Sequence, residues 1–121
     1  LSSAASDVYK RQIPHHARIG YGLKIYHPHS VVIGRDVIIG ENCILRQGVT
    51  IGNVTHRDGR ISNSPVLGSD IEFGANAIVI GDIHIGDGAT IGAGTVVTKS
   101  LSAGAVAVGN GFRIIHADKQ A

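Results

Sequence analysis

The sequence predicts an all-β solenoid, a parallel β-helix of about four to five triangular coils with one extruded loop. Three observations support this prediction. Aliphatic residues recur every six positions, glycine often follows them directly, and large side chains are scarce, with 4% aromatic residues and neither Trp nor Met among 121 residues. A core made of Ile, Val, Leu and Ala needs a narrow, repetitive interior, which a solenoid provides.

The six-residue period defines a set of inward-pointing anchor residues. They are Ile13, Ile19, Ile25, Ile33, Ile39, Leu45, Ile51, Leu67, Phe73, Val79, Ile85, Ile91 and Val97. A period of six fits a short strand followed by a bend, so three hexads complete one coil and successive coils stack about 4.8 Å apart. An α-helix is disfavoured, because each of the 17 glycines would cost about 1 kcal/mol in a helix interior.

Two further positions of the hexad have a character of their own. The residue directly after the anchor is usually glycine, which permits a backbone geometry that a Cβ would penalise. The residue four places after the anchor is mostly small or aliphatic and is expected to fill the interior near a corner. Cys43 and His29 both stand at this position. We therefore predict that Cys43 is a core thiol rather than a nucleophile, and that His29 faces inward.

Two interruptions break the period and suggest how the chain is organised. A two-residue jog separates Ile25 from Ile33, and the sixteen residues from Ile51 to Leu67 include the polar segment 53–64. This segment predicts a loop projecting from one corner, where solenoids often place functional residues. The expected organisation is a non-native or disordered lead over 1–12, a β-helix over 13–100, and a C-terminal cap over 101–121 that covers the last strand edges.

Charge and hydropathy restrict the classes of function. The formal net charge is +2 with scattered basic residues, which argues against a nucleic-acid partner. No stretch approaches the about 20 apolar residues of a membrane span, and no secretory signal is visible. The single cysteine excludes an intrachain disulfide and favours a reducing, cytoplasmic location.

Three segments resemble the hexapeptide-repeat acyltransferases, most closely the serine O-acetyltransferases and their relatives from polysaccharide loci. The segments are HARIGYGLKIYHPHSVVIG (16–34), CILRQGVTIG (43–52) and the repeats of 66–97, and the resemblance extends over 13–115. It implies a left-handed β-helix that forms a homotrimer, with active sites between neighbouring subunits. It also implies acetyl-CoA bound along the coils as acetyl donor, and no metal.

The resemblance assigns the base and raises a question about the acceptor. In this family a histidine of the segment DHxxGVVIG acts as general base, and His27 falls on it. Tyr26 stands where the family has aspartate. The family also has a histidine beside a proline at the end of the loop, whereas here Ser64 precedes Pro65. His56, earlier in the loop, is the candidate substitute.

The resemblance also implies residues that border acetyl-CoA. The segments FGANAIVIGD and IGAGTVVTK resemble coils beside the pantetheine arm, and GNGFRII resembles the family's GxPAR segment. The residues carried over from these segments are Ala75, Gly81, Ala93, Lys99 and Arg113.

Acetyl transfer to a hydroxyl fits these residue types. An alcohol is a weak nucleophile, and a histidine with an ordinary pKa of about 6.5 can remove its proton at neutral pH and contribute about 10²–10⁴-fold. Glycine-rich backbone N–H groups are candidates for stabilising the oxyanion. No covalent enzyme intermediate is needed.

Several alternatives remain open from the sequence. The acceptor is serine or a sugar hydroxyl of a polysaccharide or nucleotide sugar, and the missing aspartate favours the sugar. A metal-dependent β-helix enzyme would need histidines on adjacent coils, and His84 has no suitable partner beside it in the repeat. A non-catalytic solenoid of the ice-binding kind would need a regular face of threonines, whereas the outward positions here are irregular and charged.

Overall fold

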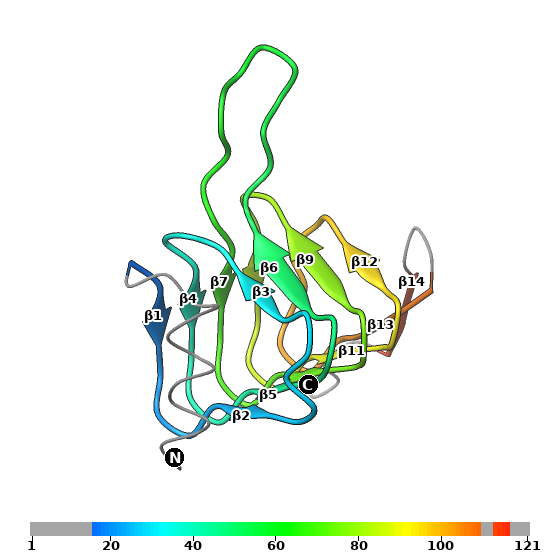
Figure 1. Ribbon diagram of the computed structural model, residues 1–121. Coiled ribbons are helices and arrows are strands. Elements are labelled where there is room, and N and C mark those ends of the chain that lie inside the picture. The colour runs from blue at the N-terminus through cyan, green and yellow to red at the C-terminus, as the bar shows by residue number, and fades with distance from the viewer. Residues whose placement is uncertain (1–15, 110–112, 117–121) are drawn as a thin grey trace.

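The computed structural model describes residues 16–109 and 113–116, so the predicted lead over 1–12 lies outside the described residues. The described strands form three sheets that make the three walls of a prism (Figure 1). The first wall contains β1 (Arg18–Ile19), β4 (Ile38–Ile39), β7 (Val66–Leu67) and β10 (His84–Ile85). The second wall contains β2 (Lys24–Ile25), β5 (Ile44–Leu45), β8 (Glu72–Phe73), β11 (Thr90–Ile91), β13 (Val106–Val108) and β14 (Arg113–His116). The third wall contains β3 (Val32–Ile33), β6 (Thr50–Gly52), β9 (Ile78–Ile80) and β12 (Val96–Val97).

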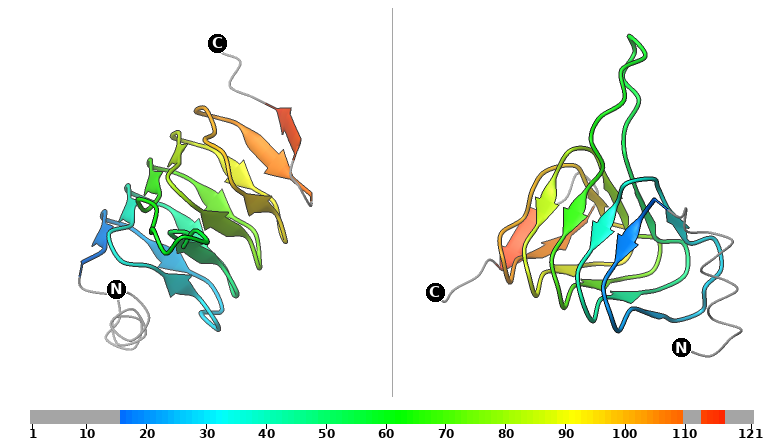
Figure 2. Two further views of the ribbon diagram at one scale, coloured as in Figure 1. Left: turned by 90° about the horizontal axis from the view of Figure 1, so that it is seen from above. Right: turned by 90° about the vertical axis from the view of Figure 1, so that its left-hand side faces the viewer.

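Each of the first four coils contributes one strand to each wall, and the coils stack along one axis (Figure 2). Neighbouring strands in a wall are parallel, with anchor facing anchor, as in the pair of Ile33 and Ile51. The exception is β14, which pairs antiparallel with β13 at the end of the second wall. The predicted parallel β-helix is confirmed, and its form is consistent with the left-handed winding that the resemblance implies. No described helix is long and apolar enough to cross a membrane.

The core consists of the anchors and the residues four places after them. Both columns are buried from Val37 to Val97 except at Thr55, where the loop begins, and Phe73 is the largest fully buried side chain. Cys43 is fully buried, its thiol donates a hydrogen bond to the Gly68 carbonyl at 3.3 Å, and burial raises the pKa of the thiol. The prediction of a core thiol is therefore confirmed.

The prediction that His29 faces inward is wrong. His29 is exposed, and Val31 takes the inward position with 1% of its surface accessible. The two extra residues of the jog lengthen this corner, so the inward position moves from the fourth to the sixth place after Ile25.

Glycine follows the anchors because the next coil approaches closely. A Cβ on Gly74 would lie 2.4 Å from the backbone nitrogen of Ala93, well inside van der Waals contact. Within the described residues these glycines lack positive φ angles. A Cβ at these positions is therefore disfavoured because it would clash with the neighbouring coil. The backbone conformation, which the sequence suggested as the reason, does not exclude it.

The repeat continues into the segment 101–121. Leu101 pairs in parallel with Ile85, and Ala107 of β13 pairs in parallel with Ile91. Leu101 follows the anchor Val97 by four positions instead of six, so this corner is shorter than the others. β14 then covers the last strand of the second wall.

Two corners of the prism matter for function, and we name them by their contents. The His27 corner joins the second and third walls and comprises residues 26–30, 46–48, 74–76 and 92–94. The loop corner joins the third and first walls and comprises 34–37, 53–65, 81–83 and 98–100. The two corners are the opposite edges of the third wall.

Candidate functional site

His27 lies in the jog and adopts an unusual backbone conformation. Its φ is 53°, and that of Ser30 is 61°, in a region that residues with a Cβ rarely occupy. The His29 N–H donates to the His27 carbonyl at 2.6 Å, which closes the turn around Pro28. His27 is exposed. An exposed histidine in a strained backbone conformation, held by a tight turn, is a candidate functional residue.

A ladder of backbone hydrogen bonds runs along the His27 corner. Gly48 N–H donates to the His29 carbonyl at 2.8 Å, Asn76 N–H to the Gln47 carbonyl at 2.9 Å, and Gly94 N–H to the Ala75 carbonyl at 2.8 Å. Ala75 and Ala93 therefore lie on the same edge as His27, on the third and fourth coils. With about 4.8 Å per coil, Ala93 lies about 14 Å along the axis from His27.

The small residues of this edge leave backbone donors open. Within the part of the chain that the structure describes, the N–H groups of Ala75 and Ala93 donate to no acceptor. Ala75 is half-buried and Ala93 is exposed. Open amide donors spaced along an edge, with little side-chain bulk, fit an extended ligand that is rich in amide groups, such as the pantetheine arm of acetyl-CoA.

The predicted loop is present as a hairpin at the loop corner (Figures 1 and 2). Thr55 and Ile61 form an antiparallel bridge, and the His56 N–H donates to the Arg60 carbonyl at 2.7 Å. The Arg60 guanidinium pairs with the Asp58 carboxylate at 2.7 Å. His56 thus begins the tip of the hairpin and is exposed.

Two further predicted residues lie at the base of the hairpin. Gly81 has a φ of 102°, and its N–H donates to the Gly52 carbonyl at 3.0 Å. Lys99 is exposed one coil further on and forms no ion pair with any described residue. Arg113 lies in β14, whose backbone pairs with Val108 of β13.

The structure therefore divides six of the seven predicted site residues into two groups, and Arg113 in β14 belongs to neither. His27, Ala75 and Ala93 follow the His27 corner, whereas His56, Gly81 and Lys99 belong to the loop corner. Since the width of the third wall separates the two groups, one chain does not bring His27 and His56 to the same corner.

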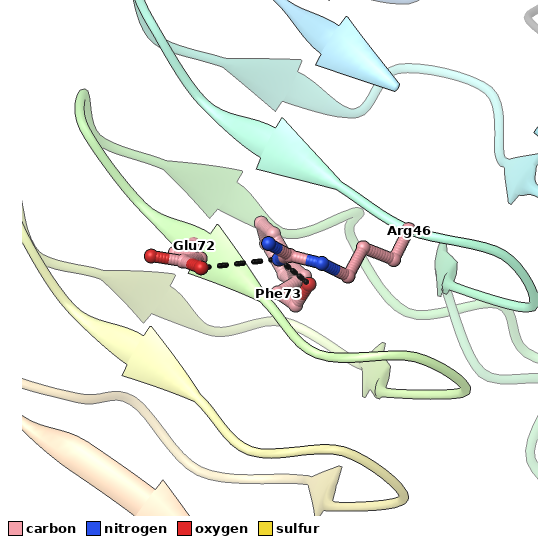
Figure 3. Close-up of polar contacts among 3 residues, drawn as sticks. All are labelled: Arg46, Glu72 and Phe73. Carbon is pink, nitrogen blue, oxygen red and sulfur yellow. Dashed lines mark hydrogen bonds and ion pairs between the residues drawn. The ribbon is translucent and has the colours of Figure 1, made fainter. Parts of the chain in front are cut away.

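A cluster beside His27 was not among the predicted residues. The Arg46 guanidinium lies 5.6 Å from the centre of the Tyr26 ring. It also donates to Glu72 Oε2 at 3.1 Å and to the Phe73 carbonyl at 3.4 Å, as Figure 3 shows. A signal existed in the sequence. Tyr26 and Arg46 both directly follow an anchor, where glycine is usual. Glu72 precedes an anchor 26 residues after Arg46, and the sequence gave no sign of that partner.

The outer face of the third wall is uncharged. The side chains next to its anchors are stacked in register, and anchors point inward, so these point outward. They are Val32, Thr50, Ile78 and Val96. The equivalent positions of the other walls include Arg18, His84, Lys24 and Glu72.

Two other features of the described residues lie apart from these groups. A surface cavity between the first and second coils is lined by His16, Arg18, Asp36 and Ile38, none of which is a predicted site residue. Among residues 16–109 and 113–116, no group of three or more His, Cys, Asp or Glu side chains is placed to hold a metal ion.

Comparison with protein families matches two stretches of the repeat. A family described as bacterial transferase hexapeptide (six repeats) matches residues 64–99, and one described as hexapeptide repeat of succinyl-transferase matches 30–54.

Three relatives illustrate what the chain is similar to. Serine acetyltransferase of Synechococcus elongatus is 39% identical over 83% of this chain and 40% of its own length. Serine acetyltransferase of Helicobacter pylori is 38% identical over 98% of this chain and 68% of its own length. The putative colanic acid biosynthesis acetyltransferase WcaB of Escherichia coli is 40% identical over 81% of this chain and 59% of its own length.

Two solved structures of serine acetyltransferases are also similar to this chain. Serine acetyltransferase of Neisseria gonorrhoeae in complex with serine superposes with a TM-score of 0.73 at 36% identity, over 81% of this chain and 39% of that one. A serine acetyltransferase in complex with CoA has a TM-score of 0.73 at 31% identity, over 83% and 40%. The chain thus spans about 40% of the length of these solved proteins. With the hexad, the fold and these matches in agreement, the chain belongs to the hexapeptide-repeat acyltransferase family, close to the serine acetyltransferases.

Proposed function

We propose that the chain is an acetyl-CoA-dependent O-acetyltransferase that uses His27 as its general base. The observation that most supports this is the arrangement of the His27 corner, where an exposed histidine lies on the same edge as the open backbone donors of Ala75 and Ala93. The relative solved with CoA adds support, because its fold matches the same coils.

The chemistry follows from these positions. Acetyl-CoA supplies an acetyl group activated as a thioester. The His27 imidazole takes the proton from the acceptor hydroxyl as its oxygen bonds to the acetyl carbon, and the carbon–sulfur bond then breaks. The protonated imidazole returns that proton to the departing sulfur, so His27 ends the cycle neutral. Ala75 and Ala93 hold the pantetheine amides, and Lys99 offers a cation for the phosphates.

We propose that the active unit is a homotrimer. The uncharged outer face of the third wall suits burial against other copies, because burying its column of Val32, Ile78 and Val96 removes apolar surface from water. When three prisms turn this wall toward a threefold axis, the two edges of the wall in neighbouring copies meet. The His27 corner of one subunit then lies beside the loop corner of the next, and each site combines His27 with Lys99 and the hairpin of a neighbour.

The acceptor in this proposal is a small molecule with a hydroxyl group. Serine is one candidate, since the gonococcal relative is solved in complex with it. A sugar is the second, favoured by Tyr26 in place of the family's aspartate and by the similarity to WcaB. The reaction needs no metal. We place it in the cytoplasm, because both the donor acetyl-CoA and the single thiol of Cys43 suit that compartment.

The first test replaces His27 with a residue that can adopt the same positive φ. Asparagine tolerates positive φ, so His27→Asn removes the base without adding strain. We expect turnover to fall by about 10²–10⁴-fold, with the melting temperature and CoA affinity unchanged. The readout is release of the CoA thiol, and buried Cys43 keeps the background of such an assay low.

The matched control is His84→Asn, because His84 is also exposed but lies on the first wall. It should leave turnover unchanged. If His27→Asn retained turnover within threefold of the unsubstituted chain, His27 would not be the base.

A further inference from the structure

A mixed aromatic and ionic cluster of Tyr26, Arg46 and Glu72 extends from the His27 corner onto the outer face of the second wall, where Glu72 lies in β8. The three residues come from the first, second and third coils, and Arg46 lies between the other two. Tyr26 directly precedes His27 in the chain, and both side chains are exposed.

All three side chains of the cluster are partly exposed, and Arg46 has N–H groups that a ligand can bind. Tyr26 is 46% exposed, and the side chains of Arg46 and Glu72 are 35% and 49% exposed. Arg46 uses only Nη1 for its bonds to Glu72 and the Phe73 carbonyl, so its Nε and Nη2 groups donate to nothing among the described residues. Because Nη1 is bonded to Glu72 and to the Phe73 carbonyl, the planar guanidinium has a fixed orientation, and its Nε and Nη2 donors lie in a defined plane.

The charge of the cluster selects among acceptors. Arg46 and Glu72 form an ion pair, so the cluster has no net charge. The described residues of the His27 corner include no Asp or Glu, so one chain offers the ammonium group of serine no unpaired carboxylate, and Arg46 attracts only the carboxylate of serine. Glu72 lies two coils from Tyr26, about 10 Å along the axis, and is already paired with Arg46.

A neutral pyranose fits the same features. Its C–H face packs on an aromatic ring, since such rings have an apolar body. Its neighbouring hydroxyls accept hydrogen bonds from a planar guanidinium. We infer that the acceptor is a pyranose hydroxyl, selected over serine by Tyr26 and Arg46, with Glu72 as the residue that positions Arg46. This inference rests on the proposed acetyl transfer and names its acceptor.

The test compares acceptors and variants. Thiol release from acetyl-CoA is measured with L-serine and with methyl glucopyranoside, methyl galactopyranoside, methyl mannopyranoside and N-acetylglucosamine. We expect release with at least one pyranose and a kcat/KM for serine at least about tenfold lower. Tyr26→Asp should lower kcat/KM for the pyranose about tenfold and raise that for serine.

Two variants separate acceptor contact from general damage. Arg46→Gln should raise KM for the pyranose about tenfold while KM for acetyl-CoA stays within twofold, the pattern of lost acceptor binding. Glu72→Gln should raise the same KM by a smaller factor. Tyr21→Asp and Arg18→Gln are the controls and should change neither constant, because Tyr21 is exposed at the corner between the first and second walls and Arg18 is exposed on the first wall.

CoA binding, measured by calorimetry, separates the possible failures. If CoA binds and only serine is acetylated, or no acceptor is, the pyranose assignment is overturned and the donor site stands. If CoA does not bind and no thiol is released, the proposed function fails, and the acceptor assignment fails with it. Equal losses for serine and pyranose in Tyr26→Asp would also overturn the assignment.

Discussion

Glycine occupies two positions of the hexad for two different physical reasons. Directly after the anchor, as at Gly74, the neighbouring coil leaves no room for a Cβ. Three places after the anchor, as at Gly48 with a φ of 74°, the corner needs a left-handed backbone. Asn42 and Asn76 occupy this second position in other coils with φ near 60°, because asparagine tolerates this conformation and most residues do not.

Substitution of glycine to alanine should therefore depend on the stacking contact. Gly74→Ala should destabilise the fold by about 1–3 kcal/mol, because the new methyl group forces two coils apart. Urea denaturation followed by circular dichroism measures this loss.

Gly52→Ala is the matched control, since nothing lies within 4 Å of a Cβ at that position and its φ is not positive. Its unfolding free energy should stay within about 0.5 kcal/mol of the original. Equal effects of the two substitutions would mean that coil stacking does not explain the glycine column.

At the scale of elements, the hairpin is an insertion into one corner of an otherwise regular coil. Ile39 pairs with Leu67, 28 positions further along the chain, whereas Leu67 pairs with Ile85, 18 positions further. The ten additional residues all leave and re-enter at the loop corner. The strands on either side keep their register, so the hairpin adds no contact that the stacked coils need.

Deletion of residues 54–63 should restore a regular coil and leave the fold intact. We expect the unfolding free energy to change by less than about 1 kcal/mol, since closing a shorter loop costs little entropy. Acetyl transfer should fall by at least about tenfold, because the hairpin supplies one side of the proposed site. Thermal melting and thiol release measure the two effects.

A deletion variant that melted much earlier would show that the hairpin stabilises the coils. One that melted normally and kept full turnover would remove His56 and its neighbours from the proposed site.

At the scale of the whole molecule, the third wall explains why the candidate residues fall into two groups. His27 lies at one edge of this wall and the hairpin at the other, and the uncharged column of Val32, Thr50, Ile78 and Val96 lies between them. In the proposed trimer, assembly about a threefold axis would join opposite edges of neighbouring copies. A complete site would then need two chains.

Mixing two inactive variants tests this arrangement. The His27→Asn chain keeps its hairpin, and the chain lacking 54–63 keeps His27. Co-produced, they should regain about a quarter of the original turnover, the share of interfaces in random trimers that join an intact His27 to an intact hairpin. Sites formed within one chain would give no recovery.

The control for this experiment disrupts the wall itself. Ile78→Lys, made in both chains, should abolish recovery and reduce the particle mass from three times the 12.6 kDa chain to one, since a buried lysine without a partner is costly. Thr90→Lys, at the equivalent position of the second wall, should leave mass and recovery unchanged. Light scattering after size exclusion measures the mass.

The sequence by itself determined the coil. The pattern that determines it is local: an anchor at every sixth position, the glycine after it and the small residue beyond. Each hexad therefore packs in the same way as the one before. Leu45, Ile51 and Phe73 are buried where the period predicts them. The hairpin was also predictable, because a polar segment such as 53–64 cannot contribute anchors.

The tertiary structure decided which residues share an edge. A two-residue jog, a ten-residue insertion and a corner shortened before Leu101 each shift the count along the chain, so the corner that a residue occupies depends on all coils before it. Only the stacked register pairs Arg46 with Glu72 and lines up His27 with Ala75 and Ala93. Such contacts join residues that are distant in sequence, and the hexad, which repeats identically on every wall, contains no information about them.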